Sequence, residues 1–306
     1  MLRIGVIGVG YFGRHHVRIL SSLDSIDLIG VVDCIPERAK FIGEQYGTPF
    51  YTHHHQIMNK VEAVVIAVPT VDHYTVTKDF LNEGIDVLVE KPITKTLQEA
   101  DGLIDLAHKK GAALQVGFLE RLNPAFEAAM PIIRDPRFIE TYRIGTFVPR
   151  SLDIDVVLDL MIHDIDIVLS IVKSPLKVVH AAGVPVLTKE IDMANARLEF
   201  DSGCVVNLTA SRVNSEKIRK VRIFQSDTYI SLDYTTQEVY VSNLIRDPKT
   251  NFPTIQTRRL KIEKEEPLKK ELKSFIDAVE NGTEVVVSGQ DARLSMEVAM
   301  RVLQKI

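Results

Sequence analysis

The chain has 306 residues, of which 45% are hydrophobic and 25% charged, and its formal net charge is −4. This length is sufficient for two domains, and the composition is that of a globular protein. The weak negative charge gives no electrostatic reason to expect nucleic acid or an anionic membrane as a partner. No apolar run is long enough to span a bilayer, and the first residues predict a strand instead of a signal peptide.

Only two cysteines are present, Cys34 and Cys204, and they lie far apart in the sequence. A disulfide framework is therefore not expected, and a reducing cytoplasm is the default location. We expect both thiols to behave as small buried hydrophobic groups.

The first part of the chain alternates short apolar strands with amphipathic helices. The expected strands are 3–7, 28–32, 63–67, 86–89 and 113–116, and the expected helices are 11–22, 36–46, 71–83 and 97–110. This alternation is typical of βαβ units and a parallel sheet. We assign residues 1–120 to a nucleotide-binding Rossmann domain.

Beyond residue 120 the pattern changes to longer alternating runs, which predict an antiparallel sheet with one wetter face. The expected strands are 138–147, 177–187, 194–200, 205–211, 221–224, 229–232 and 238–241, and the expected helices are 124–133, 154–172, 267–280 and 290–305. The predicted fold class is α/β, with a C-terminal α/β domain (121–306) built on a large, mostly antiparallel sheet. The last helix is expected to pack back on the first domain.

A glycine-rich turn, Gly8-Val9-Gly10-Tyr11-Phe12-Gly13, follows the first strand and opens a helix. Its glycines allow a tight turn, close approach of a pyrophosphate and close packing of the helix. Asp33 ends the second strand, where a carboxylate can hold the ribose hydroxyls of NAD. Because that carboxylate would repel a 2′-phosphate, NAD is favoured over NADP, although Arg38 lies one helical turn away.

Charged side chains occur at two further places next to or within apolar segments, where burying an unpaired charge would be costly. Glu90-Lys91-Pro92 closes an apolar strand, at the sheet edge where ligands bind in α/β folds. The almost wholly apolar helix 154–172 carries Asp155, Asp159, His163 and Asp166 at spacings that place them on one stripe. A structural Asp–His pair facing solvent is the alternative. A lysine, an aspartate and a histidine suit hydride transfer from an alcohol, with histidine as the base.

These motifs together resemble the Gfo/Idh/MocA family (glucose–fructose oxidoreductase / inositol dehydrogenase). The residues that carry the likeness are the glycine turn, Asp33, Ala67-Val68-Pro69-Thr70 with His73, Glu90-Lys91-Pro92 and Asp159-x-x-x-His163-x-x-Asp166. The resemblance implies that Lys91, Asp159 and His163 form the catalytic set. It also implies a homodimer or homotetramer formed through the C-terminal sheet. The expected NAD contacts are Gly8, Gly10, Tyr11, Phe12, Gly13, Asp33, Thr70, His73, Glu90 and Lys91.

A closer likeness is to a branch of that family that acts on nucleotide-activated amino sugars. It rests on residues 119–124, 147–150, 153–164 and 209–212. The resemblance implies oxidation of UDP-N-acetylglucosamine to its 3-keto form, a step toward lipid A. A diphosphate needs cations, and arginine matches phosphate in a bidentate manner. The expected substrate contacts are Arg121, Asn123, Arg150, Asp155 and Arg212, and for the arginines a surface or dimer role is the alternative.

His53-His54-His55 has the composition of a metal tract. Three consecutive side chains do not share a face of a strand or helix, and no acidic cluster adjoins them in the sequence. We therefore predict a surface turn and no metal site.

Two other functions stay open at this point. The first is oxidation of a free sugar or polyol, as in inositol dehydrogenases, with the arginines incidental. The second is an NAD-binding regulator without catalysis, which this type of fold also supports. A regulator is expected to lose members of the Lys/Asp/His set, whereas this chain has all three.

Overall fold

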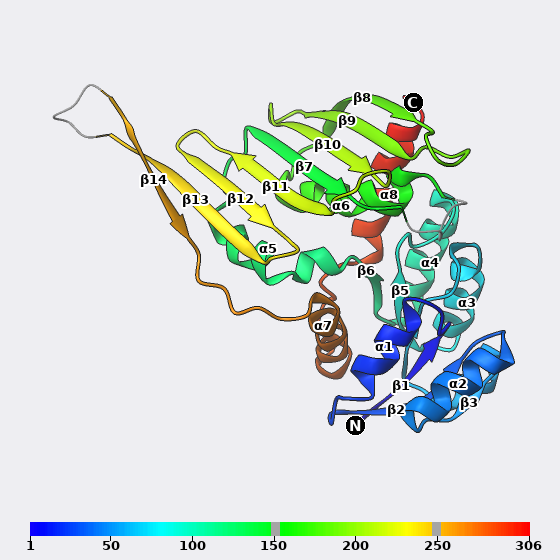
Figure 1. Ribbon diagram of the computed structural model, residues 1–306. Helices are drawn as coiled ribbons and strands as arrows, with labels where there is room; N and C mark the ends of the chain where they lie inside the picture. The colour runs from blue at the N-terminus through cyan, green and yellow to red at the C-terminus, as the bar shows by residue number, and fades with distance from the viewer. Residues whose placement is uncertain (148–153, 247–251) are drawn as a thin grey trace. The chain divides into compact units, whose positions relative to one another are not determined.

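The structure is a computed structural model that describes residues 1–147, 154–246 and 252–306. Its contacts divide the chain into two compact units (Figure 1). The first unit contains Met1–Leu119 and Leu268–Leu294, and the second contains Glu120–Pro267 and Ser295–Ile306. The sequence placed residues 121–306 in one domain, whereas by contacts the segment Leu268–Leu294 belongs with the N-terminal part.

The first unit is built on a parallel six-stranded sheet of order β3-β2-β1-β4-β5-β6. Its strands are β1 (Leu2–Ile7), β2 (Ile26–Val32), β3 (Phe50–Tyr51), β4 (Ala63–Ile66), β5 (Asp86–Glu90) and β6 (Leu114–Gly117). Its helices are α1 (Gly13–Leu20), α2 (Pro36–Tyr46), α3 (Thr70–Asn82), α4 (Leu97–Lys110) and α7 (Pro267–Asn281), with short 3₁₀ turns η1 (His54–Gln56) and η2 (Met58–Lys60). This strand order is that of a nucleotide-binding Rossmann domain.

The main core of the first unit lies between this sheet and the helices α1 and α7. Ile4 and Val6 of β1 pack there with Val17 of α1 and with Leu272 and Phe275 of α7. On the opposite face, α3 packs against β4, β5 and α4. Burying apolar side chains on both faces of a parallel sheet is what the continuous apolar strands predict.

The second unit is built on a mixed eight-stranded sheet of order β14-β13-β12-β11-β7-β10-β9-β8. Its strands are β7 (Phe138–Ile144), β8 (Leu176–Val184), β9 (Met193–Phe200), β10 (Val205–Ser211), β11 (Ile218–Phe224), β12 (Thr228–Asp233), β13 (Glu238–Ile245) and β14 (Thr254–Arg259). Its other elements are the 3₁₀ turns η3 (Leu119–Leu122) and η4 (Met130–Ile132), α5 (Pro124–Ala129), the π-helical turn η5 (Val157–Met161) and α6 (Ile162–Ile171). All pairs are antiparallel except β7 with β10. Helix α8 (Gly289–Leu303) crosses the boundary between the units at Leu294.

One face of this second sheet is covered and the other is wetter. Alternate residues of β7, such as Ile139 and Thr141, are buried, while Glu140 and Tyr142 between them are partly exposed. Helix α6 contacts β7 and β10, and α5 contacts β12 and β13. The alternation therefore gives the predicted mostly antiparallel sheet with one solvated side.

Two strands had no counterpart in the sequence prediction. The strand β3 has only two residues, and every residue of β14 is exposed. Neither has the apolar alternation that marks a strand, because an edge strand can be held by backbone pairing alone.

The cysteine prediction is half right. Cys204 is buried, but Cys34 is exposed directly after Asp33. Its position at the end of β2 places it outside the sheet, which ends at Val32. No helix among the residues that the structure describes is long and apolar enough to cross a membrane.

Candidate functional site

The glycine turn of the first unit has no room for side chains at two of its glycines. Gly8 has a φ of +85°, and a Cβ there would lie 2.7 Å from the carbonyl oxygen of Ala67. A Cβ on Gly13 would lie 1.8 Å from the carbonyl oxygen of Gly8. At Gly10, by contrast, a Cβ would meet only Arg38, at 3.8 Å. The first and third glycines therefore close the turn, while the second leaves the backbone approachable for a phosphate.

Asp33 is held at the end of β2 by the same turn. Its carboxylate accepts a hydrogen bond of 3.0 Å from the Val9 amide and one of 3.0 Å from the Ile35 amide. Arg38 donates to both carboxylate oxygens, at 3.4 and 3.2 Å. Asp33 is 5% exposed, so the side chain is fixed in orientation before any ligand binds.

The beginning of α3 carries two of the predicted cofactor contacts. Thr70 is its first residue and is partly exposed. His73 is buried, with Nδ1 2.7 Å from the Pro92 carbonyl oxygen and Nε2 2.9 Å from the Val68 carbonyl oxygen. Burial lowers the pKa of His73. We conclude that its imidazole ties the residues after β4 to Pro92, after β5, instead of presenting a nitrogen to solvent.

Glu90, at the end of β5, is paired inside the first unit. Its carboxylate oxygen Oε1 lies 2.8 Å from Nε2 of the fully buried His16 in α1. Burial alone would raise the pKa of Glu90, but the hydrogen bond to His16 and the charges of His16 and Lys91 lower it. Gly117 makes room for this group, since a Cβ there would lie 2.9 Å from Oε2 of Glu90. Glu90 is therefore an ionised, positioned carboxylate directly before Lys91.

A second carboxyl group, Glu271 of α7, belongs to the same buried region. It is 1% exposed, and neither of its carboxylate oxygens has a hydrogen-bond partner among the described residues. Nε2 of buried Gln115 in β6 lies 3.5 Å from the Glu271 carbonyl oxygen. Burial, and then the charge of Glu90, raise the pKa of Glu271 well above its usual value. Two neighbouring carboxyl groups thus take opposite states, with Glu90 ionised and Glu271 protonated.

In the second unit, the predicted catalytic helix begins with a π-helical turn. The carboxylate of Asp155 accepts hydrogen bonds from the amides of Val157 (2.8 Å) and Leu158 (2.9 Å), which fixes the start of η5. Asp159 lies within this turn and His163 in the first turn of α6, and both are partly exposed. Single π turns are frequent at functional sites. Burial raises the pKa of Asp155.

The helix α6 is held to the second sheet by a buried ion cluster. Arg143 of β7 donates to Asp164 at 3.2 and 2.9 Å and to Glu120 at 3.0 Å. Although burial disfavours its charged form, the two carboxylates raise the pKa of Arg143. Asn123 donates to Glu120 and to the Tyr234 carbonyl oxygen, and its own oxygen caps α5. The cluster therefore fixes α6, which carries His163 next to Asp164.

The arginines predicted to bind a diphosphate also make contacts within the second unit. Arg121 forms two 2.8 Å hydrogen bonds with Asp166, which also accepts from Ser295 at 3.3 Å. Arg212 is 6% exposed and donates to Asp192 at 2.7 Å and to the Ile154 carbonyl oxygen at 2.9 Å. These pairs brace the two ends of the η5–α6 segment. The prediction for Arg150 lies outside the described residues.

Comparisons with known proteins agree with this architecture. Residues 2–118 match the description "Oxidoreductase family, NAD-binding Rossmann fold", and residues 135–231 match the "GFO/IDH/MocA C-terminal domain". The chain is 33% identical, over 98% of its length and 96% of the relative's, to UDP-N-acetylglucosamine 3-dehydrogenase of Acidithiobacillus ferrooxidans. The chain belongs to the Gfo/Idh/MocA oxidoreductase family.

The likeness to that relative extends to its solved structure. The superposition gives a TM-score of 0.94 and covers 100% of this chain and 97% of the structure. An inositol 2-dehydrogenase of Rhizobium meliloti is 26% identical over 97% of this chain and 94% of its own. Levoglucosan dehydrogenase in complex with NADH, at 17% identity and a TM-score of 0.88, shares the fold. The fold class and the NAD-binding oxidoreductase assignment are thus confirmed.

The residues of the first unit fit the NAD of this family. The turn closed by Gly8 and Gly13 leaves the backbone at Gly10 approachable, and Asp33 is fixed at the end of β2. These groups would hold the pyrophosphate and the adenosine ribose. Tyr11 and Phe12, 53% and 47% exposed, stand on the same turn. The individual cofactor contacts stay predictions.

Reasoning from sequence missed the residues that support these motifs. His16, Gly117 and Glu271 position Glu90 or lie beside it, and Arg143 anchors α6. Arg143 has a sequence signal, because it is a charged residue at an inward position of the alternating strand β7, but this signal does not identify its partners. His16 follows two other polar residues in α1, and Gly117 is a glycine, so neither has such a signal.

Proposed function

We propose that this protein is an NAD-dependent dehydrogenase that oxidises the 3-hydroxyl of UDP-N-acetylglucosamine to a ketone. The observation that carries the proposal is the 33% identity, over nearly the whole of both chains, to an enzyme named for that reaction. The match includes both the Rossmann domain and the C-terminal domain. The inositol dehydrogenases that match over nearly the whole chain are less similar, at 25–26% identity.

Three side chains carry the proposed chemistry. His163 accepts the hydroxyl proton, because imidazole is the side chain poised to do so near neutral pH. Asp159, four residues earlier, orients the imidazole and stabilises its protonated form. Lys91 donates a hydrogen bond to the oxygen on which negative charge develops. NAD, when bound, supplies the hydride acceptor.

Neighbouring groups position these residues. Glu90 is fixed by His16 and directly precedes Lys91, whose positive charge helps to lower the pKa of Glu90. In the second unit, Asp155 and Arg212 hold the start of the helix that carries Asp159 and His163. Arg121, Asn123, Arg150, Asp155 and Arg212 are retained as the proposed substrate-side residues.

We also infer where the enzyme acts and how it assembles. It is a cytoplasmic enzyme, and its 3-keto product is consumed by an amination on the way to lipid A. It forms a homodimer or homotetramer through the second sheet. The two free cysteines, one of them exposed, are consistent with a reducing compartment. The wetter face of the second sheet supplies the surface for the oligomer.

The direct test is turnover of UDP-N-acetylglucosamine with NAD, followed by nicotinamide absorbance. Replacing Lys91 with Met should lower kcat by about 10²–10³-fold, as loss of an oxyanion donor does. Lys95→Met is the matched control, because Lys95 is an exposed lysine four residues further on. Wild-type-like turnover in Lys91→Met would overturn the proposed role.

A second candidate substrate class is a free sugar or polyol, favoured by the full-length matches to inositol dehydrogenases. The same assay discriminates the two classes. If N-acetylglucosamine or myo-inositol is turned over with a kcat/KM at least equal to that for the UDP-sugar, the nucleotide is not recognised. A strong loss of kcat/KM on removing UDP supports the sugar-nucleotide assignment.

A further inference from the structure

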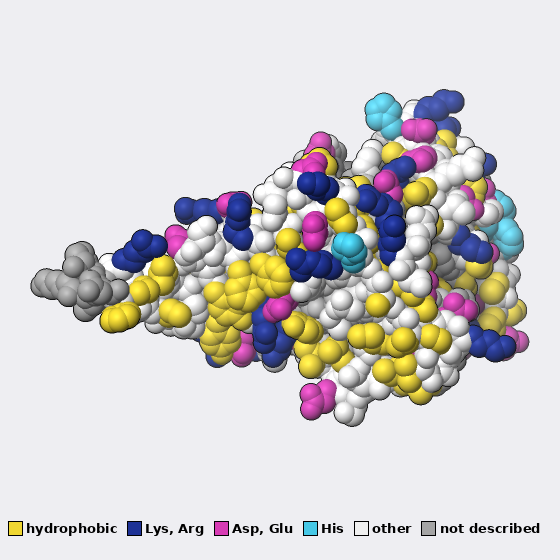
Figure 2. Space-filling view, turned by 90° about the horizontal axis from the view of Figure 1, so that it is seen from above, with side chains coloured by type: hydrophobic (Ala, Val, Ile, Leu, Met, Phe, Trp, Pro, Cys, Tyr) yellow, Lys and Arg dark blue, Asp and Glu magenta, His cyan; other side chains and the backbone are white. Residues whose placement is uncertain are grey.

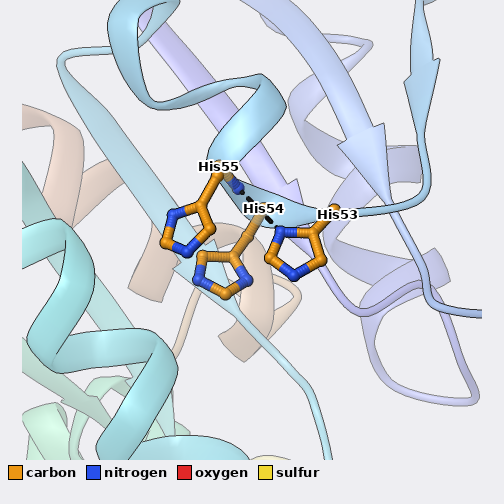
Figure 3. Close-up of side chains that lie close together, drawn as sticks. All are labelled: His53, His54 and His55. Atoms are coloured by element: carbon orange, nitrogen blue, oxygen red, sulfur yellow. Dashed lines mark hydrogen bonds between the residues drawn. The ribbon is translucent and has the colours of Figure 1, made fainter.

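The imidazole rings of His53, His54 and His55 lie close together in the first unit, and none of these residues belongs to the proposed cofactor, catalytic or substrate sites. The ring centroids of His53 and His54 are 4.8 Å apart, those of His53 and His55 4.8 Å, and those of His54 and His55 4.3 Å (Figure 3). One ligand atom of each ring lies within 4.8 Å of the others. The segment is the surface turn that the sequence predicts, and such a turn, unlike a strand or a regular helix, can bring three consecutive side chains together.

The local backbone explains this convergence. His53 is extended, whereas η1 begins directly after it, so the chain turns sharply at the tract. The His53 side chain caps this turn by accepting from the His55 amide through Nδ1, at 3.4 Å, while Gln56 reaches back to the amide of His53 at 3.0 Å. The capping box holds the turn and directs all three rings to one side of it.

An acidic side chain that is distant in the sequence adjoins the rings. Asp79 of α3 places Oδ2 2.8 Å from Nε2 of His54 and 3.8 Å from Nε2 of His55. The sulfur of Met58 lies 2.9 Å from Nδ1 of His55. A hollow of about 340 Å³ opens beside them and is lined by His55, Met58, Asn59, Asp79, Asn82 and Glu83.

Each imidazole has one nitrogen engaged by the protein and a second that none of the described hydrogen bonds uses. The engaged atoms are Nδ1 of His53, Nε2 of His54 and Nδ1 of His55. A carboxylate on one nitrogen of an imidazole orients the ring and makes the opposite nitrogen a better ligand.

We propose that His53, His54 and His55, supported by Asp79, form a binding site for a Zn²⁺-class transition-metal cation. Three imidazole nitrogens with a water in the fourth position are a common set for tetrahedral zinc. The carboxylates of Asp79 and Glu83 beside the hollow lower the electrostatic cost of a divalent charge. The site connects the turn after β3 to α3, so the cation acts as a structural clamp in the first unit.

Coordination requires a modest adjustment of the rings. Stacked rings cannot all direct their lone pairs at one point, and ligands about 2.1 Å from zinc must approach each other more closely than 4.8 Å. His53 and His55 are exposed, and exposed side chains change rotamer within nanoseconds. His54, anchored by Asp79, is the ring around which the other two rearrange.

The test is titration of the whole protein with zinc chloride in a buffer that does not bind metal, followed by calorimetry and by thermal unfolding. We expect one zinc per chain and a rise in Tm that a chelator reverses, because a ligand that binds only the folded state stabilises it. The double variant His53→Gln/His55→Gln should lose both effects. Asp79→Asn should bind about 10–100-fold more weakly, as loss of such orienting carboxylates does.

The matched control is His108→Gln/His180→Gln, since both of these histidines are exposed and lie on other elements. It should bind zinc as the wild type does. Far-UV circular dichroism without metal establishes that each variant is folded. Equal zinc binding by the wild type and by His53→Gln/His55→Gln would overturn the proposal, and so would the absence of binding to the wild type at ~100 µM zinc, far above the affinities of structural sites.

Discussion

Glu90 and Glu271 are two carboxyl groups whose charges influence each other. Against the effect of its burial, the hydrogen bond to His16 and the charges of His16 and Lys91 lower the pKa of Glu90, while burial and the charge of Glu90 raise the pKa of Glu271 well above its usual value. A neutral Glu271 avoids placing a second negative charge near Glu90, which directly precedes Lys91. Glu271 therefore acts through Glu90, as a residue that sets the charge of this region.

Replacing Glu271 with Gln tests this assignment through the pH dependence of stability. Because the folded-state pKa of Glu271 is raised, its contribution to the free energy of unfolding is full below about pH 4.5 and declines as pH rises toward the folded pKa. Gln has a similar neutral shape but cannot ionise. The free energy of unfolding of Glu271→Gln should therefore rise relative to that of the wild type, by up to about 1.4 kcal/mol per pH unit, from about pH 4.5 up to the folded-state pKa of Glu271.

Urea denaturation across that pH range measures the difference. The control is Glu280→Gln, which changes an exposed glutamate on the same helix and should leave the profile unchanged. Parallel pH profiles for the wild type and Glu271→Gln would contradict a raised pKa at this position.

At the residue scale, we propose that the Asp33–Arg38 pair determines cofactor choice. In Asp33→Ser the carboxylate that would repel a 2′-phosphate is gone, and the Arg38 guanidinium is released from its ion pair. We expect the ratio of kcat/KM values for NADP and NAD to rise by about tenfold or more, which is 1.4 kcal/mol.

Steady-state kinetics with both cofactors provides the measurement. The double variant Asp33→Ser/Arg38→Met should lose the gain for NADP, because the cation that would bind the phosphate is absent. An unchanged ratio in Asp33→Ser would show that cofactor choice is decided elsewhere.

At the scale of elements, the η5–α6 segment illustrates what the sequence could and could not predict. Its apolar composition predicted burial, and Val157 of η5 and Ile165 and Ile167 of α6 are fully buried. The four-residue spacing of Asp155 and Asp159 suggested one functional stripe, but Asp155 caps η5, and Asp166 is buried against Arg121. Spacing gives the face on which a side chain lies, whereas its partner comes from another strand or loop, which only the fold supplies.

The Arg143 cluster is an element-scale test of what holds α6 to the second sheet. Arg143→Met should destabilise the protein by about 3–5 kcal/mol, because it leaves Asp164 buried without its bidentate partner and Glu120 with Arg219, 3.7 Å away, in place of Arg143. Arg222→Met is the matched control: Arg222 is 44% exposed and lies 3.7 Å from Glu140, so its loss should cost at most about 1 kcal/mol.

Thermal or urea unfolding of the three proteins gives these differences. A cost for Arg143→Met no larger than that for Arg222→Met would mean that apolar packing alone fixes α6.

The exposed strand β14 could not be predicted from the sequence, since it pairs with β13 through its backbone and has no buried side chain.

At the scale of the whole molecule, we propose that the outer face of the second sheet binds a second copy of the chain. Alternate residues on this face include the ion pair Lys220–Asp233 and aromatic residues such as Phe224, whose ring centroid lies 4.8 Å from that of Tyr229. Figure 2 shows hydrophobic side chains gathered over the strands of the second unit. Stable interfaces combine such an apolar centre with a polar rim.

Tyr240→Asp tests this surface. Tyr240 is 40% exposed on β13, and a carboxylate in its place would have to be buried unpaired if two sheets meet there. We expect the wild type to sediment as a dimer or tetramer of the 34.4 kDa chain and Tyr240→Asp to dissociate at concentrations where the wild type does not. Phe41→Asp is the control, because Phe41 is a 66% exposed aromatic residue on α2 of the first unit. Analytical ultracentrifugation of the three proteins decides the question: a monomeric wild type, or dissociation by Phe41→Asp and not by Tyr240→Asp, would exclude this face as the interface.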